Sequence, residues 1–497
     1  ASAAEFAAND LGGDDAMNST QLMALMPILM LSLTAAVLMV QASIKRDQGL
    51  AWWITGLGFL LSLGGAIYAR DFSQPVTMLL VVDDWGLFFT ALILVASLVT
   101  LVLSKDSFSP EGERKEEYYL LLVLSVLGAV ILMQSSHMAS LLLGMELMGV
   151  ALYGMIAFPE KGELPLEAAI KYLVLSACAS AMLLFGFALI YAATGDLSYA
   201  NMGAKAAAAF SQEPVVLMAG TAMVVAGLGF KLSVVPFHMW TPDVYQGAPT
   251  PVTGFLATVS KGAVFVALAR LYQEGQLYQY DSLIMALSVV AMASMLVGNW
   301  LALRQENIKR LLAYSSIAHF GYLLIVLIAL AIVDNAAAIE LATEAITFYL
   351  AAYIVTTLAA FTVVANLAGE DDSKSMLSAF DGLFWQRPVQ AAALTVAMLS
   401  FAGIPLTAGF IGKFYLITLS IQSQLWVLLA VLVLGSAIGV YYYLRIIFAM
   451  SRTPGSRITE PSGVVIGAQE IVATLLLLLV LALGSWPQPF IQFAGAL

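Results

Sequence analysis

The chain has 497 residues, of which 61% are hydrophobic and 11% charged, and its mean hydropathy is +0.91. A soluble domain carries about 25% charged residues, so this composition excludes a soluble globular protein and predicts one whose solvent is lipid. The net charge of −11 excludes a basic nucleic-acid-binding surface. The single cysteine, Cys178, excludes an intrachain disulfide and a cysteine-ligated iron–sulfur cluster held by this chain alone. No dinucleotide-binding or phosphate-binding glycine motif is present, so no nucleotide site is predicted.

Apolar runs long enough to cross a bilayer follow one another along the chain. We expect all of them to be helices, because an open strand edge cannot lie in lipid. The fourteen runs fall near residues 21–42, 50–69, 77–104, 117–134, 138–158, 166–194, 214–239, 250–273, 282–303, 308–332, 338–367, 387–420, 424–450 and 465–486. Residues 1–16 are small, polar and acidic, and they lack the basic and apolar regions of a signal peptide. We interpret them as a cloning remnant before a native start at Met17, with a solvated tail as the alternative.

The basic residues of the loops are distributed unevenly. Counted in chain order, the odd loops hold thirteen lysines and arginines, whereas the even loops hold two, Arg70 and Lys205. The positive-inside rule therefore predicts that the odd loops are cytoplasmic and that both termini lie on the outer side. One missed or added span in the middle of the chain would mix the two sets, so the uneven distribution supports fourteen spans.

Two of the predicted spans contain residues that interrupt a helix. The seventh contains GLGFKLSVVP around Lys231, and the twelfth contains GIPLTAGFIGK, which ends at Lys413. Proline removes a helical hydrogen bond, and glycine loosens the backbone. Broken helices at corresponding positions of two halves are typical of inverted-repeat transporters. Spans four to eight and nine to thirteen form two such sets of five, and the break falls fourth in each.

The predicted fold is therefore an all-α polytopic membrane protein with two inverted five-helix repeats. The expected parts are a tail at 1–16, three transmembrane helices at 17–116, a first repeat at 117–273, a second repeat at 282–450, and a loop with the last transmembrane helix at 451–497. The two repeats share little residue-level similarity, so their assignment depends on hydropathy and on the positions of the breaks.

Four ionisable residues lie deep within the predicted spans, namely Glu146, Lys231, Lys261 and Lys413. A charge at the bilayer centre costs about 2.5–3.5 kcal/mol on insertion scales. We therefore interpret the lysines as groups that move protons or ions, with snorkelling towards the headgroups as the alternative. An isolated buried carboxylate is either neutral or paired with a base, and Lys231 is the expected partner of Glu146. A static ion pair is the alternative for these two residues.

Three further residues are weaker candidates for the same path. Lys171 lies one helical turn after Glu167, so a local ion pair or snorkelling competes with a role in transfer. His238 ends the broken seventh span and is placed to relay protons between Lys231 and the cytoplasm. His319 lies in mid-span beside serines that offer a hydrated polar path, with a packing histidine as the alternative. The histidines lack the paired spacing of metal ligands, so no metal site is predicted.

Several long runs resemble the antiporter-like proton-pumping subunits of bacterial respiratory complex I. These runs are GFKLSVVPFHMWTPDVYQGAPTPVTGFLATVSK (229–261), NIKRLLAYSSIAHFGYLL (307–324) and GIPLTAGFIGKFYL (403–416). The runs GLFWQRP (382–388), SAIGVYYYLR (436–445) and SWPQP (485–489) are similar to the N-type subunits of this family rather than to its larger members. The resemblance covers nearly the whole chain from Met17 onward.

The resemblance implies a role for each buried charge. Glu146 matches the glutamate of the family's fifth helix and Lys231 the lysine of its broken seventh helix, and the two are expected to form a switchable ion pair. Lys261 matches the central lysine of the eighth helix. Lys413 matches the exit-side lysine of the broken twelfth helix. Together they imply a proton relay along a hydrophilic axis.

The resemblance also implies the surroundings of the chain. The expected location is the bacterial inner membrane, among other membrane-arm subunits that include homologous antiporter-like ones, and among lipids but not nucleic acid. No cofactor is expected in this chain, because NAD, FMN, the iron–sulfur clusters and quinone belong to partner subunits. The alternatives are a subunit of a multi-subunit cation/proton antiporter, a mainly structural spacer of the membrane arm, and a stand-alone secondary transporter.

Overall fold

The structure, a computed structural model, describes residues 18–105, 107, 115–159, 162–332, 336–368, 372–453 and 467–494. The tail expected at 1–16 lies outside these residues. Within them, thirteen helices are long and apolar enough to cross a membrane. The remaining predicted span, the twelfth, consists of two shorter helices in succession. The prediction of an all-α polytopic membrane protein is therefore confirmed.

The elements follow the chain in four groups. The first group is α2 (Ser19–Ala24), α3 (Met26–Ile44), α4 (Gln48–Ala69), η1 (Arg70–Phe72), β1 (Gln74–Pro75), β2 (Val81–Val82) and α5 (Asp84–Ser104). The second is α6 (Lys115–Met133), α7 (Met138–Ile156), α8 (Glu163–Thr194), α9 (Tyr199–Gln212), α10 (Pro214–Leu232), α11 (Trp240–Gly247), α12 (Thr250–Phe255), η2 (Leu256–Ser260) and α13 (Lys261–Glu274). The third is η3 (Leu277–Gln279), α14 (Asp281–Ala302), α15 (Ile308–Leu330), α16 (Ala336–Ala368), η4 (Asp372–Ser375), η5 (Leu377–Phe380), α17 (Leu383–Gln386), α18 (Pro388–Ala402), α19 (Ala408–Gln422) and α20 (Trp426–Ser451). The last is α21 (Ala468–Ser485) and α22 (Gln488–Ala494).

The third span begins later than the hydropathy predicts. Residues 77–82 belong to a short antiparallel hairpin in which β1 pairs with β2, and the helix starts only at Asp84. The side chain of Asp83 caps this helix by accepting a 2.8 Å hydrogen bond from the backbone N–H of Gly86. An apolar hairpin has the same composition as a helical turn, so the hydropathy alone could not separate the two.

Several helices lie outside the predicted spans, and α9 is the longest of them. α9 lies between the sixth and seventh spans and buries Tyr199, Met202, Ala206 and Ala209 on one side. Its other side is exposed, so the helix is amphipathic rather than uniformly apolar. A search for bilayer-length apolar runs does not detect such a helix.

Both predicted breaks are present. α10 ends at Leu232, where Ser233 adopts a left-handed conformation with φ of 62°, and the helix resumes as α11 only at Trp240. α18 ends at Ala402 before Gly403, which has φ of 80°, and α19 begins at Ala408. Each break therefore leaves the last carbonyl groups of a helix without partners in that helix.

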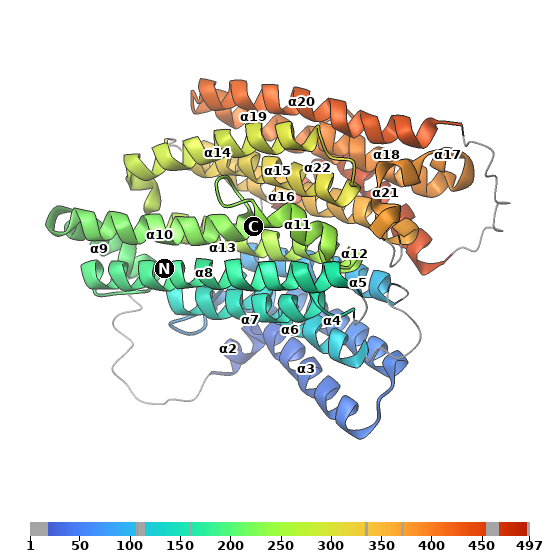
Figure 1. Cartoon of the computed structure of the whole chain (residues 1–497). Coiled ribbons are helices and arrows are strands. Elements are labelled where there is room, and N and C mark those ends of the chain that lie inside the picture. The colour runs from blue at the N-terminus through green and yellow to red at the C-terminus, as the bar shows by residue number, and fades with distance from the viewer. Residues whose placement is uncertain are drawn as a thin grey trace.

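The helices that lie deepest in the molecule are those that carry polar side chains in mid-span. The spans differ in the buried share of their most apolar stretch. This stretch is fully buried within the molecule in the eighth span (Thr250–Glu274) and in α16. In α3 only 28% of it is buried, and in α21 only 22%. Figure 1 shows α13, α15 and α16 in the middle, with α3 and α4 at one edge and α19 and α20 at the other. The central helices are thus shielded from lipid by the outer ones.

Glycines let two helical hairpins pack backbone against backbone. A Cβ atom on Gly128 of α6 would lie 2.5 Å from the backbone nitrogen of Met148 in α7. A Cβ atom on Gly298 of α14 would lie 2.8 Å from the backbone nitrogen of Ala318 in α15. Small residues allow this close approach in membrane helices. Close backbone packing at a glycine therefore joins the first two helices of each predicted five-helix set.

An ion pair ties the start of α5 to the end of α13. The guanidinium of Arg270 donates to both carboxylate oxygens of Asp83, at 2.7 and 2.8 Å, and to Glu274 at 3.1 Å. Burial of the Asp83 carboxyl raises its pKa, but the hydrogen bonds and charge of Arg270 outweigh this effect, so the net pKa of Asp83 is lowered. The pair therefore stabilises the fold at neutral pH, and its contribution is lost as the pH falls through this lowered pKa.

Replacing Asp83 by asparagine should lower the thermal stability of the protein. Breaking a fully buried pair costs about 3–5 kcal/mol. Because the side chain of Asp83 is 38% exposed, we expect a loss of about 2 kcal/mol, below that range. The check is thermal unfolding in detergent at pH 7. Asp84→Asn is the matched control, since Asp84 instead accepts from the exposed Ser73 and forms a long, exposed ion pair of 3.8 Å with Arg70. Equal melting temperatures for the two variants would contradict the anchoring role of Asp83.

Candidate functional site

The three lysines singled out by the sequence all lie inside the molecule. Lys231 is in the last turn of α10, Lys261 is the first residue of α13 after the π-helical turn η2, and Lys413 is in α19. Their exposed fractions are 3%, 0% and 7%. A snorkelling lysine keeps its ammonium in water, and these three do not. Each ammonium must therefore find its acceptors within the protein.

The ammonium of Lys231 is held by a serine and a tyrosine of neighbouring helices. Its Nζ donates a 2.6 Å hydrogen bond to Oγ of Ser176 in α8, and the hydroxyl of Tyr153 in α7 donates to the same Oγ at 2.7 Å. The ring of Tyr172 lies 5.7 Å from Nζ, a distance at which an aromatic face attracts a cation. We call Lys231, Ser176 and Tyr153 the Lys231 triad.

The carboxylate of Glu146, in α7, is bound by a serine of α8 that lies one helical turn after Ser176. It accepts a hydrogen bond from the hydroxyl of Ser180, and Ser176 and Ser180 are four residues apart on α8. Glu146 and Lys231 are close enough to interact electrostatically but do not form a direct ion pair in this structure. The two charges predicted to pair are therefore held by two separate serines of one helix.

A glycine provides the space around the Lys231 ammonium. A Cβ atom on Gly149 of α7 would lie 3.3 Å from Nζ of Lys231 and 3.4 Å from the hydroxyl of Tyr153. Gly149 is also three residues after Glu146, on the same side of the helix. A larger residue at this position would therefore crowd the ammonium.

Lys261 has a hydrogen-bonding environment of the same kind. Its Nζ donates a 2.8 Å hydrogen bond to Oγ of Ser316 in α15, and the hydroxyl of Tyr353 in α16 donates to that Oγ at 2.8 Å. The rings of Tyr245 and Phe320 lie 5.3 and 5.4 Å from Nζ. We call Lys261, Ser316 and Tyr353 the Lys261 triad. The two triads use different helices but the same three residue types.

Lys413 is held by the backbone of the second broken helix. Its Nζ donates to the carbonyl oxygens of Phe401 at 2.9 Å and Ala402 at 3.1 Å. These are among the last carbonyls of α18, which the break leaves free and which form the negative end of the helix dipole. The break next to Lys413 therefore creates the binding site of its ammonium.

His319 lies between two tyrosine hydroxyls. Its Nδ1 is 2.7 Å from the hydroxyl of Tyr349, and its Nε2 is 3.2 Å from that of Tyr443. The ring is one turn after Ser316 on α15, and Lys413 is near enough to act on it electrostatically. His319 thus lies between the Lys261 triad and Lys413, with both ring nitrogens occupied.

The other two candidates lie apart from this group. Lys171 forms the expected local ion pair with Glu167 at 2.7 Å and a second one with Asp243 of α11 at 2.9 Å. Asp243 also accepts from Arg310 of α15 at 2.7 Å. His238 is buried in the break between α10 and α11, and neither of its ring nitrogens has a hydrogen-bond partner among the described residues. The structure does not bring either side chain into contact with Lys231.

The acceptor residues were not identified from the sequence. Ser176, Tyr153 and Tyr353 each lie in an apolar helix among many other hydroxyl residues. One signal was available, since Lys171, Tyr172, Ser176 and Ser180 recur at helical spacing and place polar groups along one helix. Within the described residues, no group of three or more histidine, cysteine, aspartate or glutamate side chains is arranged to hold a metal ion.

Replacing Ser176 by alanine should destabilise the protein because the buried ammonium of Lys231 loses its acceptor. A buried polar group without a partner costs about 1–3 kcal/mol, and more when it is charged. The measurement is thermal unfolding of Ser176→Ala, Lys231→Met and the double variant. In the Lys231→Met background the serine substitution should cost much less. Additive losses would show that the hydrogen bond contributes nothing to stability.

Known proteins share this sequence and this fold. The family model described as NADH:quinone oxidoreductase/Mrp antiporter, TM, matches residues 135–439. The NADH-quinone oxidoreductase subunit N of Methylococcus capsulatus is 44% identical over 484 residues, which are 96% of each chain.

Solved structures give the same result. A chain of respiratory complex I from Thermus thermophilus is 31% identical with a TM-score of 0.79, over 95% of this chain and 100% of that chain. A chain of an archaeal membrane-bound sulfane sulfur reductase is 27% identical with a TM-score of 0.81, over 96% and 97%. A chain of the Mrp complex from Dietzia sp. shares the fold at 20% identity, with a TM-score of 0.81 over 95% and 96%. The resemblance seen in the sequence is confirmed, and the chain belongs to the NADH:quinone oxidoreductase/Mrp antiporter family of membrane subunits.

Proposed function

We propose that this chain is the N-type membrane-arm subunit of a bacterial NADH:quinone oxidoreductase and that it passes protons along Glu146, Lys231, Lys261 and Lys413. The observation that carries the proposal is that the three buried ammonium groups each have acceptors built for them by separate helices. The 44% identity to a subunit N over 96% of the chain supports the same assignment. The redox reaction, with NAD, FMN, iron–sulfur clusters and quinone, is then the task of partner subunits.

The arrangement around α8 suggests how Glu146 and Lys231 act as a switch. In the separated state seen here, Ser180 binds the carboxylate and Ser176 binds the ammonium. In the paired state the two charges would meet in the space beside Gly149. An ammonium holds its proton more tightly next to a carboxylate than it does alone. Opening the pair therefore favours release of the proton towards Lys261.

The energy available from such a switch is sufficient to move one proton against a membrane potential. Moving one charge through about 180 mV requires about 4 kcal/mol, at roughly 2.3 kcal/mol per 100 mV. A change of about 4 kcal/mol in the interaction of one buried charge is well within the range that pairing and separation produce in a low-dielectric interior. Opening and closing the pair of Glu146 and Lys231 would therefore supply enough energy for the transfer, once the redox subunits drive the switch.

The surroundings of the chain follow from the same assignment. We place it in the bacterial inner membrane, next to homologous antiporter-like subunits and lipids, with both termini on the outer side as the loop charges indicate. We further propose that 117–273 and 282–450 are inverted repeats that follow three initial helices at 17–116 and precede the last helix at 451–497. The paired breaks and the glycine contacts of α6–α7 and α14–α15 support this division.

Two alternatives make different predictions. A cation/proton antiporter subunit, as in the Mrp complex, would give transport that depends on sodium, and the fold is compatible with it. A structural spacer would give proton translocation that does not depend on the lysines. The identity to a subunit N favours the redox-driven assignment over both.

Replacing Lys231 by alanine should abolish most proton translocation by the assembled enzyme. The physical reason is that Lys231 is the group that takes up and releases the proton at the switch. The measurement is NADH-driven acidification of inverted membrane vesicles. Co-purification of the variant chain with the NADH-oxidising activity reports assembly. Electron transfer from NADH to ferricyanide should stay near the wild-type rate, because no redox centre is assigned to this chain.

Lys205→Ala is the matched control, since Lys205 is an exposed lysine paired with Asp196. It should leave translocation unchanged. Wild-type acidification by Lys231→Ala would rule out the proposed relay, and full acidification only with sodium present would favour the antiporter alternative.

A further inference from the structure

A small cavity lies between the Lys261 triad and the break that holds Lys413. It is lined by residues of α15, α16, α18 and α19, including His319, Tyr353, Thr356, Ser400 and Gly409. The space open to the centre of a water molecule is about 10 Å³, close to the minimum of about 10–15 Å³ that one buried water needs. The cavity therefore has room for a single water.

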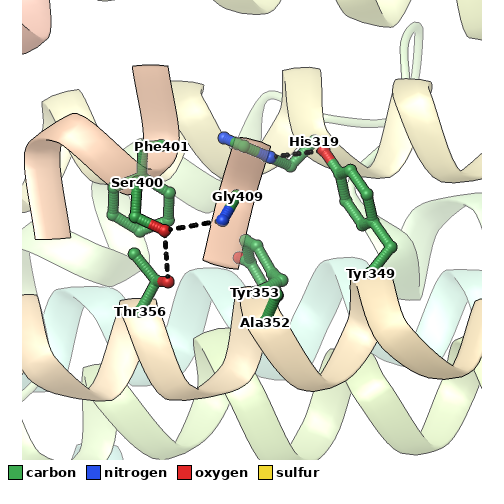
Figure 2. Close-up of a pocket in the computed structure, with 8 residues that line it drawn as sticks. All are labelled: His319, Tyr349, Ala352, Tyr353, Thr356, Ser400, Phe401 and Gly409. Carbon is green, nitrogen blue, oxygen red and sulfur yellow. Dashed lines mark hydrogen bonds between the residues drawn. The ribbon is translucent and has the colours of Figure 1, made fainter. Parts of the chain in front are cut away.

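Hydroxyl groups border the cavity on two sides. Figure 2 shows Ser400 between Thr356, whose hydroxyl is 3.0 Å away, and the backbone N–H of Gly409, which donates to Ser400 at 3.0 Å. Tyr353 lines the other side, and its hydroxyl donates to Ser316. A hydroxyl oxygen that donates one hydrogen bond can still accept from a water. A water here would thus lie between Ser400 and Tyr353, within a lining that is otherwise largely apolar.

The imidazole of His319 is less available for transfer than the sequence indicated. Although it lines the cavity, its Nδ1 is bound to Tyr349 and its Nε2 is near Tyr443. Both nitrogens must release a hydroxyl before they can carry a proton along the axis. The hydroxyl of Tyr353 already shares Ser316 with Lys261.

We propose that this cavity is a one-water site and that the Tyr353 hydroxyl, rather than the His319 imidazole, connects Lys261 to it. The inference rests on the proposed function and specifies its middle step. When the Lys261 ammonium gives a proton to Ser316, the serine passes its own proton to Tyr353, and Tyr353 passes its own to the water. Each hydroxyl gives up one proton for the one it receives. The water in turn passes one of its own protons past Ser400 to Lys413 in its deprotonated state, at the carbonyl of the neighbouring Phe401, so the transferred proton ends on Lys413 and the water stays neutral.

The step requires two hydroxyl groups to rotate. The Ser316 oxygen accepts from both Lys261 and Tyr353, so its own O–H must turn towards Tyr353. In this structure the Tyr353 hydroxyl donates towards Ser316, so it must turn towards the cavity before it can receive the serine's proton. This rotation is about the bond between the ring and the oxygen alone, so the ring need not move. The hydroxyl is thus the only part of Tyr353 that the proposal requires.

The chain offers a matched pair of variants for the test. Tyr353 and Tyr349 lie one turn apart on α16, both are buried, and both line the cavity. Tyr353→Phe removes the hydroxyl bound to Ser316, and Tyr349→Phe removes the one bound to His319. Proton translocation in vesicles with the assembled enzyme should fall about tenfold for Tyr353→Phe, as expected for the loss of one transition-state hydrogen bond. It should fall less for Tyr349→Phe, because that hydroxyl binds His319 and not Ser316.

The outcomes separate the inference from the function on which it rests. A loss in Tyr349→Phe with a normal Tyr353→Phe would assign the step to the imidazole and overturn the inference. Equal effects of the two variants, of any size, would overturn it too. Wild-type translocation in Lys261→Ala would instead overturn the proposed function. Co-purification of the variant chain with the NADH-oxidising activity verifies assembly in each case.

A second pair of variants keeps the test decisive if Tyr353→Phe does not assemble. Thr356→Val removes the hydroxyl beside Ser400 while nearly keeping the shape. Thr362→Val removes a buried hydroxyl of the same helix that bonds only its own backbone, at Leu358. Translocation should fall in Thr356→Val and not in Thr362→Val. A density map of the enzyme should also show one water within hydrogen-bonding distance of the Tyr353 hydroxyl, and a dry cavity would contradict the inference.

Discussion

A positive charge that cannot reach water is the constraint on which this structure depends. Three lysines lie in the interior at membrane depth, and each is retained only because other helices bring an acceptor to it. For Lys231 and Lys261 the acceptor is a serine hydroxyl that a tyrosine also binds. For Lys413 it is the free end of a broken helix. The helix breaks and the tight glycine contacts serve this requirement, because they set where backbones and hydroxyl groups can approach.

These acceptors are weak enough to be exchanged. A carboxylate held against each lysine would fix its charge, whereas a neutral hydroxyl or carbonyl satisfies the ammonium without binding it as an ion pair. Among the residues that the structure describes, Lys231 is the one of the three lysines with an acid close enough to act on it, and that acid is held by a different serine. In the proposed relay, the first lysine is therefore the one whose charge depends on the position of a partner. The later ones depend on hydroxyl groups and on the break.

The sequence alone was sufficient to predict the buried charges and the helix breaks, because both are costly to place in lipid. Glu146, Lys231, Lys261 and Lys413 stand out because a charge in a bilayer-length apolar run is rare, and the breaks stand out because proline and glycine disrupt helices. The serines that hold the lysines could not be found in this way. Most hydroxyl residues in these helices bond the carbonyl one turn before them, as Thr55, Ser97 and Thr362 do, and Ser176 looks the same in sequence. The pairing of Asp83 with Arg270 also escaped detection, since 187 positions separate the two residues.

The carboxylate of Asp243 has a consequence for movement. It binds Lys171 of α8 and Arg310 of α15 at once, so α11 is held by a helix from each half of the molecule. A shift of α8, which carries both serines of the switch, must either pull α11 along or break this bridge. In the first case the shift also reaches α15, which carries Ser316 and His319. One carboxylate thus gives the two halves a mechanical connection, separate from any path that a proton takes between them.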